Sequence, residues 1–188
     1  LPHRDEPGLL QMITYHLQDS LPLALLQADA GSEEDDAARR EKIEAWLDEG
    51  WGGCLLSDPR VAQIVEDSLL HGDGKSYSLL AWVIMPNHAH VLIETYEGYP
   101  LDRVVGAWKG YTAKQVNALL GRQGSLWRVD YHDRYIRDED HLEQAVLYIH
   151  GNPMRAGLVA EAKDWPFGSA RRLPTICSLW HVPFADRD

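Results

Sequence analysis

The chain has 188 residues, of which 45% are hydrophobic and 25% are charged. This size and balance fit one compact domain with a buried core, and they exclude a mainly disordered chain. The formal net charge of −11 excludes a uniformly basic nucleic-acid binder, but the charge is uneven: residues 1–100 hold 6 Lys or Arg and 18 Asp or Glu, whereas residues 101–188 hold 12 and 11. A polyanion can therefore dock on the second half while the acidic first half stays in solvent.

The first predicted elements are a strand and two helices. The β-forming residues at 11–17 predict a strand. Ser32 is a good N-cap, and the acidic run at 33–36 predicts the start of a helix that reaches residue 47. Ser57-Asp58-Pro59 opens a second helix, and the turn residues at 71–74 end it.

Two strands and a long helix follow. Nearly continuous apolar residues at 77–85 predict a central strand, and residues 88–95 form the return strand after the turn at Pro86-Asn87. Apolar residues at helical spacing then predict a third helix over 101–120.

The last part of the chain is aromatic and basic before it becomes helical. The segment 125–137 contains a predicted strand around residues 135–136. Asp138 caps a fourth helix, whose end is predicted at 151–153 because a proline disfavours the α conformation of the residue before it. Residues around 164–188 form a predicted loop-like tail.

This order of elements predicts an α+β fold, a ferredoxin-like split β-α-β sandwich with an antiparallel sheet and helices on one face. The whole chain, 1–188, forms a single predicted domain with a helical insertion around 24–71 and a C-terminal tail around 164–188.

Other classes of protein are excluded by missing features. No apolar run approaches the roughly 18–20 residues of a membrane span, and the N-terminus has no signal-peptide core. Cys54 and Cys177 lack C-x-x-C spacing, so they predict neither a disulfide framework nor a zinc site. No G-x-x-x-x-G-K-[ST] loop is present, so no nucleotide cofactor is expected. We therefore expect a protein of a reducing cytoplasm with no membrane partner.

A pair of histidines is the first candidate for chemistry. His88 and His90 are two residues apart on a predicted strand, so both imidazoles project from the same sheet face and can bind one divalent ion. An H-x-H pair is weak evidence alone, because paired histidines without a ligand are common.

The fourth helix supplies the second candidate. Tyr148 and Asn152 are one helical turn apart and share a face. Spacing alone favours an aromatic residue at the edge of the core for Tyr148 and a helix C-cap for Asn152.

Two sequence blocks resemble a known family. Pro86-Asn87-His88-Ala89-His90 and the block 148–158 (YIHGNPMRAGL) resemble the single-tyrosine transposases of the HUH endonuclease superfamily, and more narrowly the bacterial REP-associated tyrosine transposases. Residues 1–4, 108–114, 126–128 and 164–169 resemble that family too, so the resemblance spans nearly the whole chain. The long acidic insertion and the negative net charge are less typical.

The resemblance implies the HUH fold and assigns roles to four residues. His88 and His90 would bind Mg²⁺ or Mn²⁺ with Asn152 as third ligand, and Tyr148 would be the nucleophile. The implied enzyme cleaves and rejoins single-stranded DNA at palindromic repeat hairpins through a 5′-phosphotyrosine, without ATP, as a monomer or homodimer at the bacterial nucleoid.

The basic and aromatic residues of the second half are candidate DNA contacts, since aromatic rings stack on unpaired bases and arginines follow phosphates. Core packing and solvated charge are the alternative for each of them. The candidates are Arg103, Lys109, Lys114, Arg122, Trp127, Arg128, Tyr131, Arg134, Arg137 and Arg155.

Other functions remain open at this point. The chain can be a DNA-binding relative that has lost the chemistry, or a metal-binding domain unrelated to DNA. Tyr111 on the third predicted helix is a lower-ranked rival to Tyr148 as the nucleophile.

Overall fold

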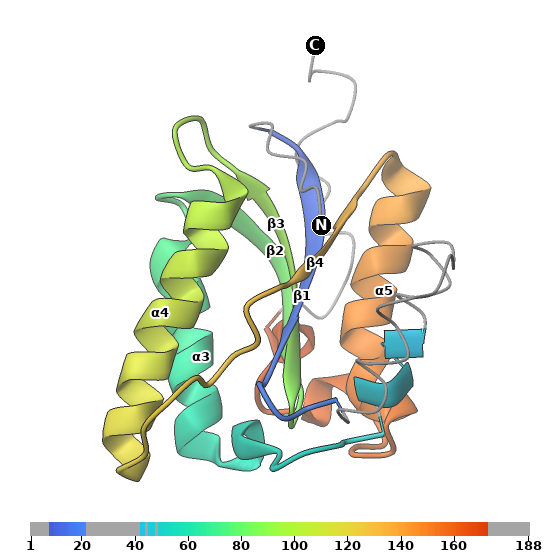
Figure 1. Cartoon of the computed structure of the whole chain (residues 1–188). Helices are drawn as coiled ribbons and strands as arrows, with labels where there is room; N and C mark the ends of the chain where they lie inside the picture. Colours follow the sequence, from blue (N-terminus) through green and yellow to red (C-terminus); the bar gives the residue numbers. More distant parts are fainter. Residues whose placement is uncertain (1–7, 22–41, 44, 48, 173–188) are drawn as a thin grey trace.

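A four-stranded antiparallel sheet organises the computed structural model, which describes residues 8–21, 42–43, 45–47 and 49–172. The strand order is β2-β3-β1-β4, and β3 lies between the parallel strands β1 and β2 (Figure 1). This is the split β-α-β arrangement. The strands are β1 (Leu10–His16), β2 (Tyr77–Ile84), β3 (His88–Thr95) and β4 (His132–Tyr135).

Three helices begin and end close to their sequence signals: α3 (Pro59–Gly72), α4 (Leu101–Leu120) and α5 (Glu139–Arg155). Asp58 caps α3 by accepting a hydrogen bond from the backbone N–H of Arg60, and Asp138 caps α5 through that of His141. Gly121 ends α4 with a φ of 62°, a conformation that glycine adopts without steric cost.

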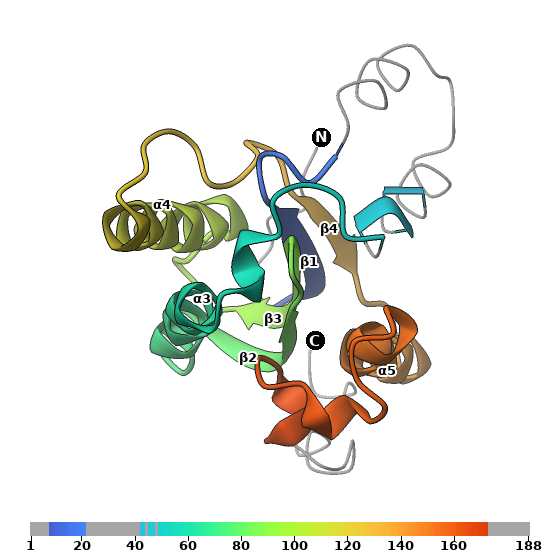
Figure 2. The ribbon, with the colours of Figure 1, turned by 90° about the horizontal axis from the view of Figure 1, so that it is seen from below.

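The helices cover both faces of the sheet, so the prediction of helices on one face was wrong. Helices α3 and α4 pack on Ile13, Tyr15, Trp82 and their neighbours, whereas α5 packs on the opposite face (Figure 2). The physical reason is that the central strands are apolar on both faces, so each face needs a cover. The α+β class with an antiparallel sheet is confirmed.

Helix α5 continues past its predicted end. It runs through Pro153 to Arg155, because a proline in the last turn removes only one backbone donor. The carbonyls of Asn152 and Pro153 accept from the N–H groups of Ala156 and Leu158, at 3.0 and 2.9 Å. Tyr148 and Asn152 therefore lie within one continuous helix.

Other boundaries shift by small amounts. Strand β1 lies one residue before the predicted range, and β4 lies at 132–135 rather than around 135–136. Residues 42–43 and 45–47 are helical, as predicted, while the rest of the first predicted helix lies outside the described residues. Helix α3, placed in the predicted insertion, is the crossover helix between β1 and β2.

The segment 165–172 covers the outer edge of β2. The Trp165 indole donates to the carbonyl of Ile84 at 2.9 Å, and the Ile84 N–H donates to the carbonyl of Phe167 at 2.9 Å. The Ser169 hydroxyl accepts from the N–H of Trp82 at 3.0 Å. Residues 165–172 thus lie back over the body of the protein; the remainder of the predicted tail, 173–188, lies outside the described residues.

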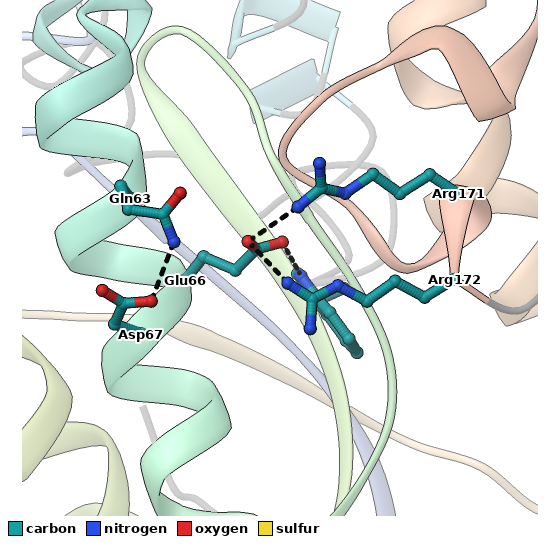
Figure 3. A network of polar contacts seen from close by, with 6 residues as sticks. Gln63, Glu66, Asp67, Arg171 and Arg172 are labelled. Atoms are coloured by element: carbon teal, nitrogen blue, oxygen red, sulfur yellow. Dashed lines mark hydrogen bonds and ion pairs between the residues drawn. The ribbon is translucent and has the colours of Figure 1, made fainter.

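A buried carboxylate fastens this segment to α3 (Figure 3). Glu66 is fully buried on α3 and accepts from the Trp82 indole at 3.1 Å. Arg172 and Arg171 reach the other carboxylate oxygen at 3.1 and 3.3 Å. A buried charge is tolerated only when it is paired and hydrogen-bonded, and Glu66 meets that condition.

We expect Glu66→Ala to lower the free energy of unfolding by about 2 kcal/mol, since it leaves the buried indole N–H without its acceptor and removes both ion pairs. The value lies below that of a fully buried pair because both arginines are partly exposed. Urea denaturation measures it. Asp67→Ala, one residue later and exposed, is the matched control; equal stabilities of the two variants would contradict the role given to Glu66.

Candidate active site

His88 and His90 lie on the face of β3 that α5 covers. In the β1–β3 register they pair with His16 and Thr14. Both imidazoles are fully buried, and their Nε2 atoms are 3.1 Å apart. The Tyr148 ring of α5 stands edge-on to His90, with centroids 5.3 Å apart. Three of the four predicted catalytic and metal-binding residues are therefore in one contact chain.

A chain of hydrogen bonds fixes the tautomer of His88. The Asn87 amide nitrogen donates to the carbonyl of Trp51 at 3.1 Å, so its oxygen faces His88. That oxygen is 2.7 Å from His88 Nδ1 and can only accept, which places the ring proton on Nδ1. The Nε2 lone pair of His88 therefore points at His90, whose own Nδ1 lies 2.8 Å from the Thr14 hydroxyl.

Both imidazoles are held neutral. Burial lowers the pKa of His90 to about 3, and the positive charge of Arg155 adds to that effect. Burial also lowers the pKa of His88 well below its usual value, with further contributions from His90 and His16. Neutral imidazole is the form that binds metal ions, and the Nδ1 partners are of the kind that orient metal-binding histidines.

The donor geometry fits a divalent ion. Two nitrogens bound at right angles to one ion, each at about 2.1 Å, lie about 3 Å apart, which matches the 3.1 Å between the two Nε2 atoms. Within the described ranges, no three His, Cys, Asp or Glu side chains gather around a common point. Among the described residues, an amide oxygen is a candidate third ligand, and Asn152, fully buried on α5, is of that type.

Asn87→Ala tests this arrangement. We expect the affinity for Mn²⁺ to fall about 10- to 100-fold, the usual cost of losing a group that orients a ligand histidine. Isothermal titration calorimetry measures the affinity. Asn117→Ala, on α4 of the opposite layer, is the control and should bind as the unmodified protein does. Unchanged affinity in Asn87→Ala would show that the Asn87–His88 contact does not orient the metal site.

Tyr148 is half-buried and lies under a cation. The Arg155 guanidinium carbon is 4.1 Å from the centre of its ring, and an Arg155 nitrogen donates to the Tyr148 carbonyl at 3.2 Å. His150 points elsewhere and lies 2.8 Å from the Ser169 hydroxyl. That contact ties α5 to the segment at the edge of β2.

Sequence reasoning missed three residues of the site: Thr14, His16 and Asn87. His16 is buried, its Nδ1 lies 2.6 Å from the Ser20 hydroxyl, and burial lowers its pKa to about 4. Only the strand register places Thr14 and His16 beside the histidine pair. The role of Asn87 could have been predicted from the sequence, since it directly precedes His88.

The structure corrects two candidate DNA contacts. Trp127 and Tyr131 are only 5% and 7% exposed and belong to the core beneath α4, so neither ring can stack on a base. The Trp127 indole donates to Thr112 at 2.8 Å. Core packing was the alternative for both residues, and it is the one found.

The basic candidates do not form one group. Lys109 is half-buried and donates to the carbonyls of Val129 and Asp130 at 2.6 and 3.3 Å. Arg122 and Arg128 are also half-buried. The exposed candidates are Arg103, Lys114, Arg134, Arg137 and Arg155.

Tyr111 is separated from the histidine pair. It is 52% exposed on α4, which covers the other face of the sheet. Of the two rival tyrosines, only Tyr148 contacts a site histidine.

Comparisons with known proteins find similarity to transposases. Residues 60–152 match the model of a family described as Transposase IS200 like. The REP-associated tyrosine transposase of Escherichia coli is 29% identical over 98 residues, covering 52% of this chain and 57% of that protein. A Haemophilus influenzae protein described as a candidate of the same kind is 27% identical over 106 residues, covering 51% and 60%. The match spans somewhat more than half the length of these relatives.

A solved structure with a similar fold is among the matches. It is described as the REP-associated tyrosine transposase bound to a REP hairpin, and it superposes with a TM-score of 0.59 at 18% identity over 92% of this chain and 82% of that one. The resemblance read from the two sequence blocks is confirmed by these matches. No described helix of this chain is long and apolar enough to cross a membrane.

Proposed function

Because residues 60–152 match the family described as Transposase IS200 like, we propose that the chain is a divalent-metal-dependent endonuclease and strand transferase for single-stranded DNA. The contact chain His88–His90–Tyr148 carries this proposal. It joins two neutral imidazoles with the ring of a tyrosine on a separate helix. A retired site would be expected to have lost at least one member of the set.

The proposed reaction is a transesterification at Tyr148. Its phenolic oxygen attacks the phosphorus of a phosphodiester, forming a Tyr–O–P bond, while the bond from phosphorus to the 3′-oxygen breaks. The phenolic proton leaves to solvent, and the 3′-oxygen takes up a proton to become a free hydroxyl. The 5′-phosphate stays on Tyr148 and keeps the bond energy, so the reverse attack by a 3′-hydroxyl rejoins strands without ATP.

Residues around Tyr148 have distinct roles in this proposal. His88, His90 and Asn152 would hold Mg²⁺ or Mn²⁺, which offsets the charge that develops on the phosphate oxygens. Asn87 and Thr14 orient the two imidazoles. Arg155, over the Tyr148 ring, places a fixed positive charge beside the reacting phosphate.

We propose hairpin DNA as the substrate class. The support is that a protein of the same fold is described as bound to a REP hairpin, and that Arg134, Arg137 and Arg155 are exposed. Arg137 precedes α5, Arg155 is its last residue, and Arg134 lies on β4 just before it, and we propose that a phosphate backbone passes along these residues.

The test uses single-stranded hairpins with palindromic-repeat sequence, labelled at either end and incubated with Mn²⁺, Mg²⁺ or chelator. We expect a metal-dependent nick with a protein-linked 5′ end on a denaturing gel. Binding with no nick under either metal would instead indicate a DNA-binding protein without the chemistry. Absence of binding as well would point to a metal-binding domain unrelated to DNA.

A further inference from the structure

A groove between α3 and α4 lies on the face of the sheet opposite the histidine pair. It has a volume of about 560 Å³, within the range of about 300–1,000 Å³ typical of small-molecule sites. Its walls come from the end of α3, which contributes Asp67 and His71, and from Arg103 and Tyr111 of α4 with the preceding Tyr99. Nothing in the proposed cleavage reaction uses this groove.

Hydrogen bonds and close packing hold the floor of the groove in place. The Trp108 indole is buried and donates to the Tyr77 hydroxyl at 2.9 Å, and that hydroxyl donates to the carbonyl of Leu69. Gly72 faces the same tyrosine so closely that a Cβ would overlap its ring. Bulkier residues at position 72 would therefore displace the floor, and the shape of the groove exists before any ligand arrives.

The rim of the groove carries two exposed tyrosines and one arginine, and its wall also contains one aspartate. Tyr99 and Tyr111 are 43% and 52% exposed, and Arg103 lies between them in sequence, two helical turns before Tyr111. No carboxylate of the described residues is paired with the Arg103 guanidinium, whereas Asp67 accepts a hydrogen bond from Gln63 at 2.8 Å. A single exposed tyrosine needs no explanation, but two exposed tyrosines around one cavity, beside an arginine that forms no ion pair with a described carboxylate, do.

We propose that the α3–α4 groove binds one unpaired nucleotide of the DNA strand on which the protein acts, an inference that rests on the proposed function and extends it. The base stacks on the tyrosine rings, and Arg103 binds the adjacent phosphate. The polar atoms of Asp67 and His71 face the edge of the base. A nucleotide offers a planar ring for the tyrosines and an anionic phosphate for Arg103. An uncharged aromatic side chain of a peptide would leave Arg103 unpaired.

The groove is remote from the cleavage site. Its floor residue Tyr77 pairs with Thr95 at one end of β3, and His88 lies seven residues away at the other end. At about 3.3 Å per residue, this separation is about 23 Å along the strand. A nucleotide held in the groove would therefore lie outside the cleaved bond and would fix the course of a single-stranded extension.

The experiment measures binding in the absence of cleavage, using Tyr148→Phe protein and fluorescence anisotropy. One probe is a hairpin with a single-stranded extension of about ten nucleotides, within the range of known single-strand sites; the other is the same hairpin without it. The double variant Arg103→Gln/Tyr111→Ala is compared with the parent. Lys163→Gln/Leu119→Ala, which removes an exposed charge and an exposed apolar side chain outside the groove, is the matched control.

We expect the groove variant to lose about 5- to 30-fold in affinity for the extended hairpin, as stacking and phosphate contacts predict. It should bind the hairpin without the extension as the parent does, and the control should bind both as the parent does. A 5-iodouracil in the extension should crosslink to the groove tyrosines.

Equal affinity of parent and groove variant for the extended hairpin would overturn the proposal, whether or not the protein cleaves DNA. Titration with free dGMP tests whether the groove binds a free nucleotide instead. The strand assignment would be overturned if the parent binds dGMP, the groove variant does not, and both bind the extended hairpin equally. The groove would then be assigned to a free nucleotide. If the unmodified protein fails to cleave the same extended hairpin while the crosslink is retained, the proposed function would be contradicted and the groove assignment would stand.

Discussion

Tyr148→Phe is expected to form no covalent adduct with a cleaved hairpin and to lower the cleavage rate by at least about 10³-fold, since removal of a covalent nucleophile costs that much or more. Phenylalanine keeps the ring contact with His90 and the position under Arg155. The metal site and the fold should therefore persist. The measurement is a denaturing gel of end-labelled hairpin with Mn²⁺, run beside a Mn²⁺ binding titration.

Tyr96→Phe is the matched control for this variant. Tyr96 is an exposed tyrosine directly after β3 and outside the site, so its variant should cleave as the unmodified protein does. Cleavage that survives in Tyr148→Phe would exclude Tyr148 as the nucleophile and indicate attack by water or by another hydroxyl. Loss of Mn²⁺ binding in Tyr148→Phe would instead place the phenolic oxygen among the metal ligands.

A strong loss of stability in mild acid is the second large effect that we expect. Burial lowers the pKa of His16 to about 4 and of His90 to about 3, and it lowers that of His88 as well. The unfolded chain takes up protons on these residues near pH 6.5, while the folded chain does not. The neutral histidines therefore contribute fully to the free energy of unfolding above about pH 6.5. This contribution falls as the pH drops toward the pKa values of the folded protein.

At pH 5 each of the three histidines lowers the free energy of unfolding by up to about 2 kcal/mol relative to neutral pH. The combined loss is a large part of a typical stability of about 5–15 kcal/mol. The Asp58 carboxyl, whose pKa Arg60 lowers to about 2, titrates below this window. Urea denaturation between pH 8 and pH 5 in the presence of chelator measures the effect. His16→Gln should flatten the profile and the exposed His71→Asn should not; a flat profile for the unmodified protein would contradict buried neutral histidines.

The sequence predicts the parts of the fold that local patterns control. The bounds of β3 and α4 agree with prediction to the residue, because the alternation of His88, Ala89 and His90 and the apolar spacing of α4 are signals within one segment. The side of the sheet that α5 covers is not such a signal. It depends on which face the crossover helices α3 and α4 have already occupied.

In the candidate site too, the sequence predicts what local patterns control and not what depends on tertiary contacts. His88, His90 and Tyr148 could be predicted from two sequence blocks, and their contact agrees with that prediction. Thr14 and His16 could not, since only the pairing of β1 with β3 brings them beside the histidines. Trp127 reads as an exposed ring in a basic segment, but a hydrogen bond to Thr112 and contact with Tyr15 hold it in the core.

The histidine pair and Tyr148 lie on separate elements, β3 and α5, and their order in the chain has a consequence for the newly made protein. The proposed nucleophile follows the histidine pair by about 60 residues, which corresponds to about 3–12 s of synthesis at 5–20 residues per second. During that interval the ribosome-bound chain carries both imidazoles and the means to orient them, but no tyrosine on the opposing helix. Under the proposed mechanism, a chain still being translated would bind the metal ion before it could break a DNA strand, because cleavage would require α5 to dock on the sheet.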